Sequence, residues 1–366
     1  MLNSVNVLDL SRVLAGPLTT MMLGDLGARV IKVEKPGTGD DTRGWGPPFD
    51  SRGESAYYLS VNRNKKSIAL DLDVAADRQL VLDLAAEADV VIDNFRPGTM
   101  ERRGVDPEVM LDANPKLIWC TITGFGEESA RLGYDLVVQA ESGWMSITGE
   151  PDGEPMRVGV ALADIIAGKD AAIAILGALV ARGMSLEPMS PNERRIHISL
   201  ADSARAALIN VAQNALVTGN DAKRWGNQHP NLVPYQLFHA ADRPMIVAVG
   251  TDNQWKAFAD VVGLDEMRDD PHLTTNAGRL ASRDRIVSAV SERLRTRTAD
   301  EWIDKLDRVG VPAGLVKSVL ESLAEAGASA LTGIEPSVPG TVRLPPPRLD
   351  EHGAEIRAHR WSVFSG

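Results

Sequence analysis

The chain of 366 residues is long enough for about two domains, and its 44% hydrophobic and 24% charged residues exclude a disordered or collagen-like protein. A formal net charge of −11 repels nucleic acid and anionic membranes, so we expect neither as a partner. The single cysteine, Cys120, excludes an internal disulfide and a thiolate metal cluster; we expect it to be a buried small hydrophobe in a reducing, cytoplasmic setting.

The first half of the chain alternates predicted strands and helices. Apolar, β-rich runs predict strands at 5–10, 29–34, 66–72, 89–94 and 117–123. Helical periodicity follows Pro17 and covers 75–86. This alternation predicts an α/β fold with a Rossmann-like, doubly wound parallel sheet. Such sheets bind ligands beyond the carboxyl ends of their strands, here in the loops 12–17, 34–41, 94–104 and 124–135.

A long, largely apolar helix is predicted at 165–182, followed by a strand at 195–200 and a helix at 201–218. The longest apolar run, 171–181, is far below the ~20 residues of a membrane-spanning helix, and the N-terminus lacks the basic region of a signal peptide. We therefore expect no membrane partner.

The character of the chain changes after residue 218. The segment 219–234 is polar and rich in Gly, Asn and Pro, which is typical of a connection or a binding loop. A strand pair and three helices then predict a smaller α+β domain at 225–315. We expect a large domain at 1–220, with the tail 316–366 packing back on it.

Several common catalytic signatures are absent from the sequence. There is no Walker phosphate loop, no dinucleotide-binding glycine pattern after the first strand, and no nucleophile elbow of a serine hydrolase. The six histidines include no pair at metal-ligand spacing, so we expect no metal site. Basic residues in or beside the ligand loops suit either phosphate binding or a solvated face; they are Arg63, Lys65, Lys66, Arg96, Arg102 and Arg103.

Asp164 is the most distinctive carboxylate, because it stands in an apolar stretch at the start of the long helix. Backbone N–H groups and the positive helix end can hold a carboxylate there, while partial desolvation makes it a better nucleophile. The alternative is a simple cap of the helix start.

Short motifs spread along nearly the whole chain resemble those of the class III coenzyme A transferases, the family that includes formyl-CoA transferase. They occupy residues 7–17, 23–28, 30–37, 39–43, 64–68, 94–98, 133–135, 148–151 and 157–160. The resemblance implies an interlocked homodimer and, as partners, acyl-CoA and carboxylic acid substrates. It implies no cofactor beyond coenzyme A as a substrate.

The resemblance also assigns the site residues. The family's catalytic aspartate falls on Asp164. Its coenzyme A contacts fall on Leu14, Ala15, Lys35, Leu70, Asp71, Leu72, Asp73, Asn94, Phe95, Arg96, Arg102, Leu132, Gly133, Tyr134 and Asp135. Lys35 stands where the family often has arginine, so it keeps the charge and loses the planar fork.

The implied mechanism is covalent: Asp164 attacks the donor thioester, becomes an aspartyl-CoA thioester, and passes CoA to the acceptor acid. One alternative is a racemase of the same fold, which uses the histidine of a Gly-His-Asp motif; this chain has Gly133, Tyr134 and Asp135 there, and a phenol is a poor base at neutral pH. A second alternative is a non-catalytic acyl-CoA-binding protein, in which Asp164 is only a cap.

The family's glycine-rich substrate loop corresponds here to Gly226, Asn227, Gln228 and His229, followed by Pro230 and Asn231. This loop is more similar to those of family members that use dicarboxylates. We therefore expect a dicarboxylate such as succinate as one partner, with His229 and Asn231 as candidates for binding its second carboxylate; a plain structural role for His229 remains open.

Overall fold

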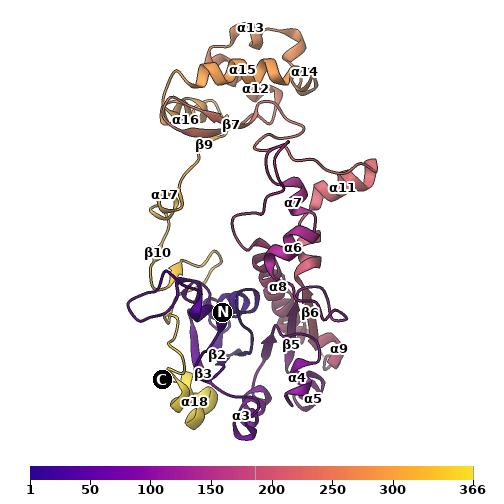
Figure 1. Cartoon of the computed structure of the whole chain (residues 1–366), viewed down its shortest axis with the longest axis vertical. Coiled ribbons are helices and arrows are strands. Elements are labelled where there is room, and N and C mark those ends of the chain that lie inside the picture. The colour runs from indigo at the N-terminus through magenta and orange to yellow at the C-terminus, as the bar shows by residue number, and fades with distance from the viewer. Residues whose placement is uncertain (186, 366) are drawn as a thin grey trace. The chain divides into compact units, whose positions relative to one another are not determined.

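The computed structural model describes residues 1–185 and 187–365. They form two compact units (Figure 1). The first comprises Met1–Met145, Arg157–Asn220 and the chain from Ala326 onward, and the second comprises Ser146–Met156 and Asp221–Glu325. The segment Ser146–Met156 thus differs from the predicted ranges, because its backbone is hydrogen-bonded to the chain around Arg224 and Gly226.

A six-stranded sheet forms the centre of the first unit, in the order β3-β2-β1-β4-β5-β6 and with every pair parallel. The strands are β1 (Asn6–Asp9), β2 (Arg29–Glu34), β3 (Lys65–Ala69), β4 (Val90–Asp93), β5 (Ile118–Thr123) and β6 (Arg195–Ser199). This order confirms the predicted parallel α/β sheet. The order reverses between β1 and β4, which is where doubly wound sheets open a ligand crevice.

Successive side chains of a strand point to opposite faces of the sheet, and one hydrophobic core lies on each face. Val7, Val30 and Ile122 belong to a core with helices α1 (Ala15–Asp25), α8 (Leu162–Met184) and α10 (Leu200–Ala206). Their neighbours Leu8 and Ile31 belong to a second core with α3 (Ala75–Ala86), α5 (Pro107–Ala113) and the tail elements α18 (Gly353–His359) and η3 (Arg360–Phe364). Cys120 is fully buried, as predicted.

The remaining elements of the first unit are short. They are η1 (Asp41–Gly44), α2 (Ala56–Leu59), α4 (Thr99–Arg102), α6 (Asp135–Glu141), α9 (Pro191–Arg194), α11 (Ile209–Thr218), β10 (Ala328–Ser329) and β11 (Gly333–Ile334), while α7 (Trp144–Ile147) spans the junction of the units. The single helix predicted at 201–218 is wrong: Ile209 has a φ of 41°, outside the right-handed region, and splits it into α10 and α11.

The second unit has its own antiparallel sheet, in the order β7-β8-β9, and its own core. Its elements are β7 (Tyr235–His239), β8 (Pro244–Ala248), α12 (Asp252–Val262), α13 (Asp265–Arg268), η2 (Pro271–Leu273), α14 (Asn276–Ala281), α15 (Arg283–Leu294), α16 (Ala299–Asp307), β9 (Ala313–Leu315) and α17 (Val319–Leu323). Trp255, Phe258 and Trp302 are buried in this core.

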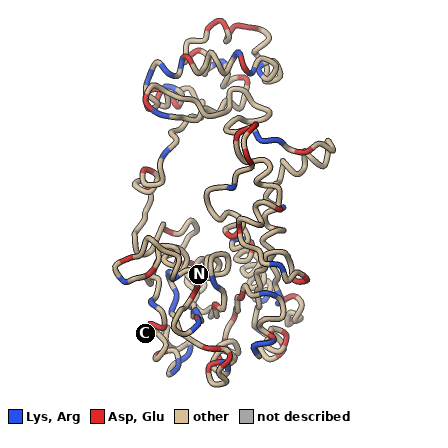
Figure 2. The backbone as a smooth tube through the Cα atoms, viewed as in Figure 1, with Lys and Arg blue, Asp and Glu red and all other residues tan. Residues whose placement is uncertain are grey.

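Charged residues are spread along the traces of both units rather than gathered in one block (Figure 2). Among the described residues, no helix combines the length and the apolar character needed to cross a bilayer.

Candidate functional site

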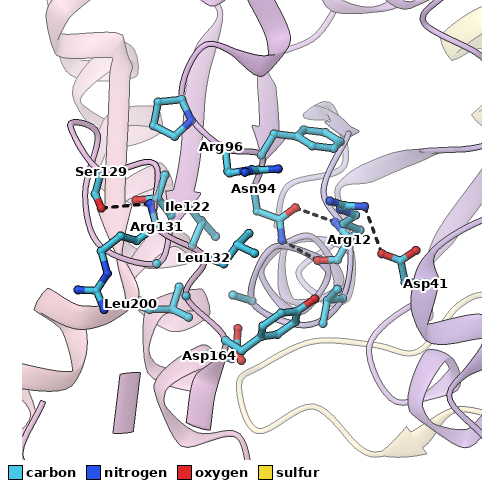
Figure 3. Close-up of a pocket in the computed structure, with 18 residues that line it drawn as sticks. Arg12, Asp41, Asn94, Arg96, Ile122, Ser129, Arg131, Leu132, Asp164 and Leu200 are labelled. Atoms are coloured by element: carbon cyan, nitrogen blue, oxygen red, sulfur yellow. Dashed lines mark hydrogen bonds and ion pairs between the residues drawn. The ribbon is translucent and has the colours of Figure 1, made fainter. Parts of the chain in front are cut away.

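An open groove with a cavity volume of about 130 Å³ lies at the carboxyl ends of β1, β4 and β5, within the first unit. Loops that follow these three strands line it, together with Asp164 of α8 and Leu200 of α10 (Figure 3). We call it the first groove. Its place beside β1 and β4 is the one that the switch-point rule predicts.

Asp164 reaches the first groove because α8 packs closely against α1. A side chain at Gly168 would come within 2.7 Å of the Ala15 carbonyl oxygen, so only glycine permits this approach. Thr19 Oγ1 donates to the Gly168 carbonyl at 2.9 Å and ties the two helices together. The start of α8 is thereby fixed beside the first turn of α1.

The electrostatic surroundings of Asp164 disfavour its charged form. Burial, followed by the negative charge of Asp135, raises the pKa of Asp164 to about 7, while a hydrogen bond from the Ala15 backbone N–H opposes the shift. Burial and the charges of Asp164 and Asp135 also raise the pKa of Tyr57 to about 12, so this phenol stays protonated nearby.

Asp135, not Asp164, provides the carboxylate that caps the start of α8. Its Oδ1 accepts from the Ala163 N–H at 2.8 Å, and its Oδ2 accepts from Gln139 Nε2 at 2.6 Å. The residue before α8, Ala161, supplies no side-chain cap. Asp164 therefore does not cap the start of α8, and the Asp164 carboxylate faces the groove instead.

The loop after β1 is braced from two sides. Asn94 accepts from the Arg12 N–H at 2.9 Å and donates to the Arg12 carbonyl at 2.6 Å (Figure 3). Asp40 accepts from the N–H of Val13, whose φ of 71° lies in the left-handed region. Lys32, fully buried, pairs with Asp40 at 3.0 Å and donates to the Ser11 carbonyl at 2.9 Å. These contacts hold the turn that presents the Ala15 N–H.

A second groove with a cavity volume of about 320 Å³ adjoins the first and shares Arg12, Asp41 and Phe95 with it. At the junction, Arg12 pairs with Asp41 at 3.2 Å and lies 5.3 Å from the centre of the Phe95 ring. Lys35 and Arg103 add positive charge to the second groove.

Most of the residues predicted to contact coenzyme A line these grooves. The first groove contains Ala15, Asn94, Phe95, Arg96, Leu132, Gly133 and Tyr134, and the second contains Lys35, Leu70, Asp71, Leu72 and Asp73. Three others line neither groove. Leu14 is buried in the protein, Arg102 donates to Thr99 Oγ1 in α4, and Asp135 caps α8.

The site assignment left out Arg12, Asp41 and Arg131, which all line a groove, and Arg103, which also lines one, was named only as a basic residue suited to phosphate binding. Arg12 and Arg131 stand in the very loops that the switch-point rule selected, so that rule alone could have found them. Arg103 is the neighbour of the predicted Arg102, and only the backbone of α4 decides which of the two faces the groove.

The predicted substrate loop, Gly226 to His229, belongs to the second unit. Nδ1 of His229 accepts from the Asn231 N–H at 3.0 Å, and the ring lies 5.0 Å from the ring of Tyr235. In the neutral imidazole the proton is then on Nε2, which makes this nitrogen a donor. Within residues 1–185 and 187–365, no cluster of three His, Cys, Asp or Glu side chains is arranged to hold a metal ion.

Comparisons with known proteins agree with the family predicted from the motifs. The family model described as CoA-transferase family III matches residues 2–354. The succinyl-CoA:glutarate CoA-transferase of Mus musculus is 41% identical over 328 residues, which cover 89% of this chain and 74% of that protein. The succinate–glutarate CoA-transferase of Agrobacterium fabrum is 38% identical over 98% of this chain and 95% of its own.

A solved structure of a CAIB/BAIF family protein from Brucella suis superposes with a TM-score of 0.85 at 39% identity, over 97% of this chain and 98% of the other. The chain therefore belongs to CoA-transferase family III.

Proposed function

We propose that the protein transfers CoA from an acyl-CoA donor to a free carboxylic acid through an aspartyl-CoA thioester on Asp164, with a dicarboxylate such as succinate as one partner. One observation carries the proposal: the half-buried Asp164 carboxylate lines a groove and is not consumed in capping its own helix. Trapping of the activated Asp164 carbonyl as a hydroxamate in the presence of acyl-CoA tests it.

The proposed reaction exchanges acyl groups without net proton transfer. A carboxylate oxygen of Asp164 attacks the donor thioester carbonyl, the C–S bond breaks, and a mixed anhydride and CoA thiolate result. The thiolate attacks the Asp164 carbonyl, forming the aspartyl thioester and releasing the donor acid as a carboxylate. The acceptor carboxylate repeats both steps in reverse and regenerates Asp164. The Ala15 N–H, already directed at Asp164, is the donor best placed to stabilise the oxyanions.

We propose that the two grooves together bind coenzyme A. The pantetheine arm would follow the first groove to Asp164, and the phosphates would lie near Lys35 and Arg103 in the second. A local basic site is needed because the protein as a whole carries a charge of −11 and repels phosphates.

The pKa of Asp164 predicts how the first half-reaction depends on pH. Only the carboxylate attacks, so the single-turnover rate with acyl-CoA should fall about tenfold per pH unit below about 7 and level off above it. Asp135→Asn removes the neighbouring charge but keeps an acceptor for the Ala163 N–H, and should move the inflection to lower pH. A rate that is flat from pH 5 to 8 in the unaltered protein would contradict this role for Asp164.

The proposed dicarboxylate specificity is tested with matched acceptors. Butyrate is glutarate without its second carboxylate, so with succinyl-CoA as donor we expect kcat/KM for glutarate to exceed that for butyrate by at least about tenfold. His229→Ala should reduce this preference, because it removes the Nε2–H donor. Use of monocarboxylates only would reject the dicarboxylate proposal.

We further propose an interlocked homodimer in the cytoplasm. Large apolar side chains are exposed on α11, where Ile209 and Leu216 are 74% and 78% exposed, and on α8, where Ile173 is exposed. Such surface favours a partner chain. Light scattering should give twice the monomer mass, unchanged on dilution, since linked chains separate only by unfolding. A monomer at micromolar concentration would exclude this assembly.

A further inference from the structure

One guanidinium group in the second unit contacts both flanks and the centre of the predicted substrate loop. Arg283, at the start of α15, donates from Nη2 to the carbonyls of His229 and Pro230, both at 3.0 Å. Its Nη1 donates to Gln228 Oε1 at 3.4 Å, and its guanidinium lies 5.5 Å from the ring centre of Trp225. Only the planar fork of arginine satisfies these contacts at once.

A second arginine, one turn before, holds the end of the same segment. Arg279 is 1% exposed and donates to the Val233 carbonyl at 3.0 Å and to Asp252 at 2.8 Å. Asn276, at the start of α14, donates to the Asn231 carbonyl at 2.7 Å, which lies between the carbonyls that the two arginines bind. Side chains of α14 and α15 therefore donate hydrogen bonds to several backbone carbonyls of the loop, which fixes the loop conformation without a bound ligand.

The two arginines differ in how their charge is balanced. Arg279 is neutralised by Asp252, whereas no carboxylate of the described residues lies within ion-pair distance of the Arg283 guanidinium. Burial lowers the pKa of Arg283, and the adjacent Asp284 only partly opposes this. The hydrogen bonds of the half-buried Arg283 guanidinium go to the loop itself, while the Glu150 carboxylate lies beside Gly226 of the same loop.

His229 is the loop residue that this grip fixes most completely. Arg283 binds its carbonyl, its N–H donates to the Tyr235 carbonyl at 3.0 Å, and its Nδ1 is occupied by the Asn231 N–H. The orientation of its ring, and with it the direction of the Nε2–H, is thus set from three sides.

We propose that Arg283 is the positioning residue for acceptor specificity: it fixes the backbone of His229, so that the Nε2–H of this residue is held in place for the second carboxylate of a dicarboxylate. This inference rests on the proposed function. It assigns no chemical step to Arg283, so the residue should act on acceptor binding and leave the reaction of Asp164 with the donor unchanged.

The test compares Arg283→Leu and Arg283→Lys with Arg285→Lys as the matched control. Arg285 lies on the same helix, is exposed and pairs with Asp270 outside the loop. We expect Arg283→Leu to raise KM for glutarate about tenfold or more and Arg283→Lys to raise it less. KM for butyrate, and the rate at which hydroxylamine traps Asp164 as a hydroxamate in the presence of acyl-CoA, should stay within twofold of the parent. Arg285→Lys should change none of these.

The inference is overturned if Arg283→Leu leaves KM for glutarate unchanged, or if it raises KM for glutarate and butyrate equally. Should Arg283→Leu fail to fold, Arg283→Lys, which keeps the charge and loses the planar fork, provides the same comparison. Loss of trapping or of dicarboxylate use in the parent protein would instead refute the proposed function, so the two failures are distinguishable.

Discussion

Asp164→Asn is expected to lower kcat for CoA transfer by at least about 10⁴-fold, because an amide cannot form the anhydride and thioester on which both half-reactions depend. The substitution keeps the shape of the side chain, so binding of CoA should change little. Steady-state kinetics with succinyl-CoA and glutarate, and calorimetric titration with CoA, measure the two effects separately.

Unfolding of Asp164→Asn does not explain the expected loss of kcat, because the raised pKa of Asp164 means that its charged form destabilises the folded protein. The pKa of Asp164 is raised from 3.8 to about 7, so its stabilising contribution is present below about pH 4 and is lost as the pH rises through 7. At pH 8 the neutral asparagine should therefore leave the protein at least as stable as the parent. Turnover above about 1% of the parent rate would contradict the catalytic role. A parent protein that binds acyl-CoA without turnover would favour the non-catalytic alternative.

Asp9→Ala is expected to destabilise the fold by about 3–5 kcal/mol, because it leaves a buried lysine without its partner. Asp9 pairs with Lys65 at 3.0 Å, and both are fully buried. Burial alone raises the pKa of Asp9, but the charges of Lys65 and Lys32 outweigh it and lower the pKa to about 2. Burial also disfavours the charged form of Lys65 and lowers its pKa to about 8, although the charge of Asp9 opposes this shift.

Chemical denaturation at pH 7 measures this loss. Asp41→Ala removes an exposed ion pair with Arg12 and should cost less than about 1 kcal/mol, which makes it the matched control. Asp9→Leu combined with Lys65→Met should recover part of the loss, since no unpaired charge remains. A cost below about 1 kcal/mol for Asp9→Ala would show that the buried charges are not coupled as the distances indicate.

The sheet was predictable because its signal is local. The predicted strands are short runs between turn residues, and all six became strands, although β3 and β6 contain more polar than apolar residues. The place of the ligand crevice was predicted from the order in which strands and helices alternate along the chain. Asp164 was singled out because a carboxylate in an apolar helix start is unusual. Patterns of residue type along the chain carry this information.

The use of individual side chains was not predictable, since it depends on contacts between distant residues. The side-chain amide of Asn94 is hydrogen-bonded to the backbone of Arg12, 82 positions away. Leu14 is buried in the protein although it neighbours the site. Arg283 reaches His229 across 54 positions, and neither residue marks the other in the sequence. The break at Ile209 likewise follows from a backbone conformation that no residue preference indicated.

The most direct test of the account is mass spectrometry of the protein mixed with succinyl-CoA and quenched with hydroxylamine, which converts an aspartyl thioester or anhydride into a stable hydroxamate. We expect the peptide containing Asp164 to carry this modification, only in the presence of acyl-CoA, and we expect no such modification in Asp164→Asn. A modification on another residue, or none at all while the protein still turns over, would contradict this expectation.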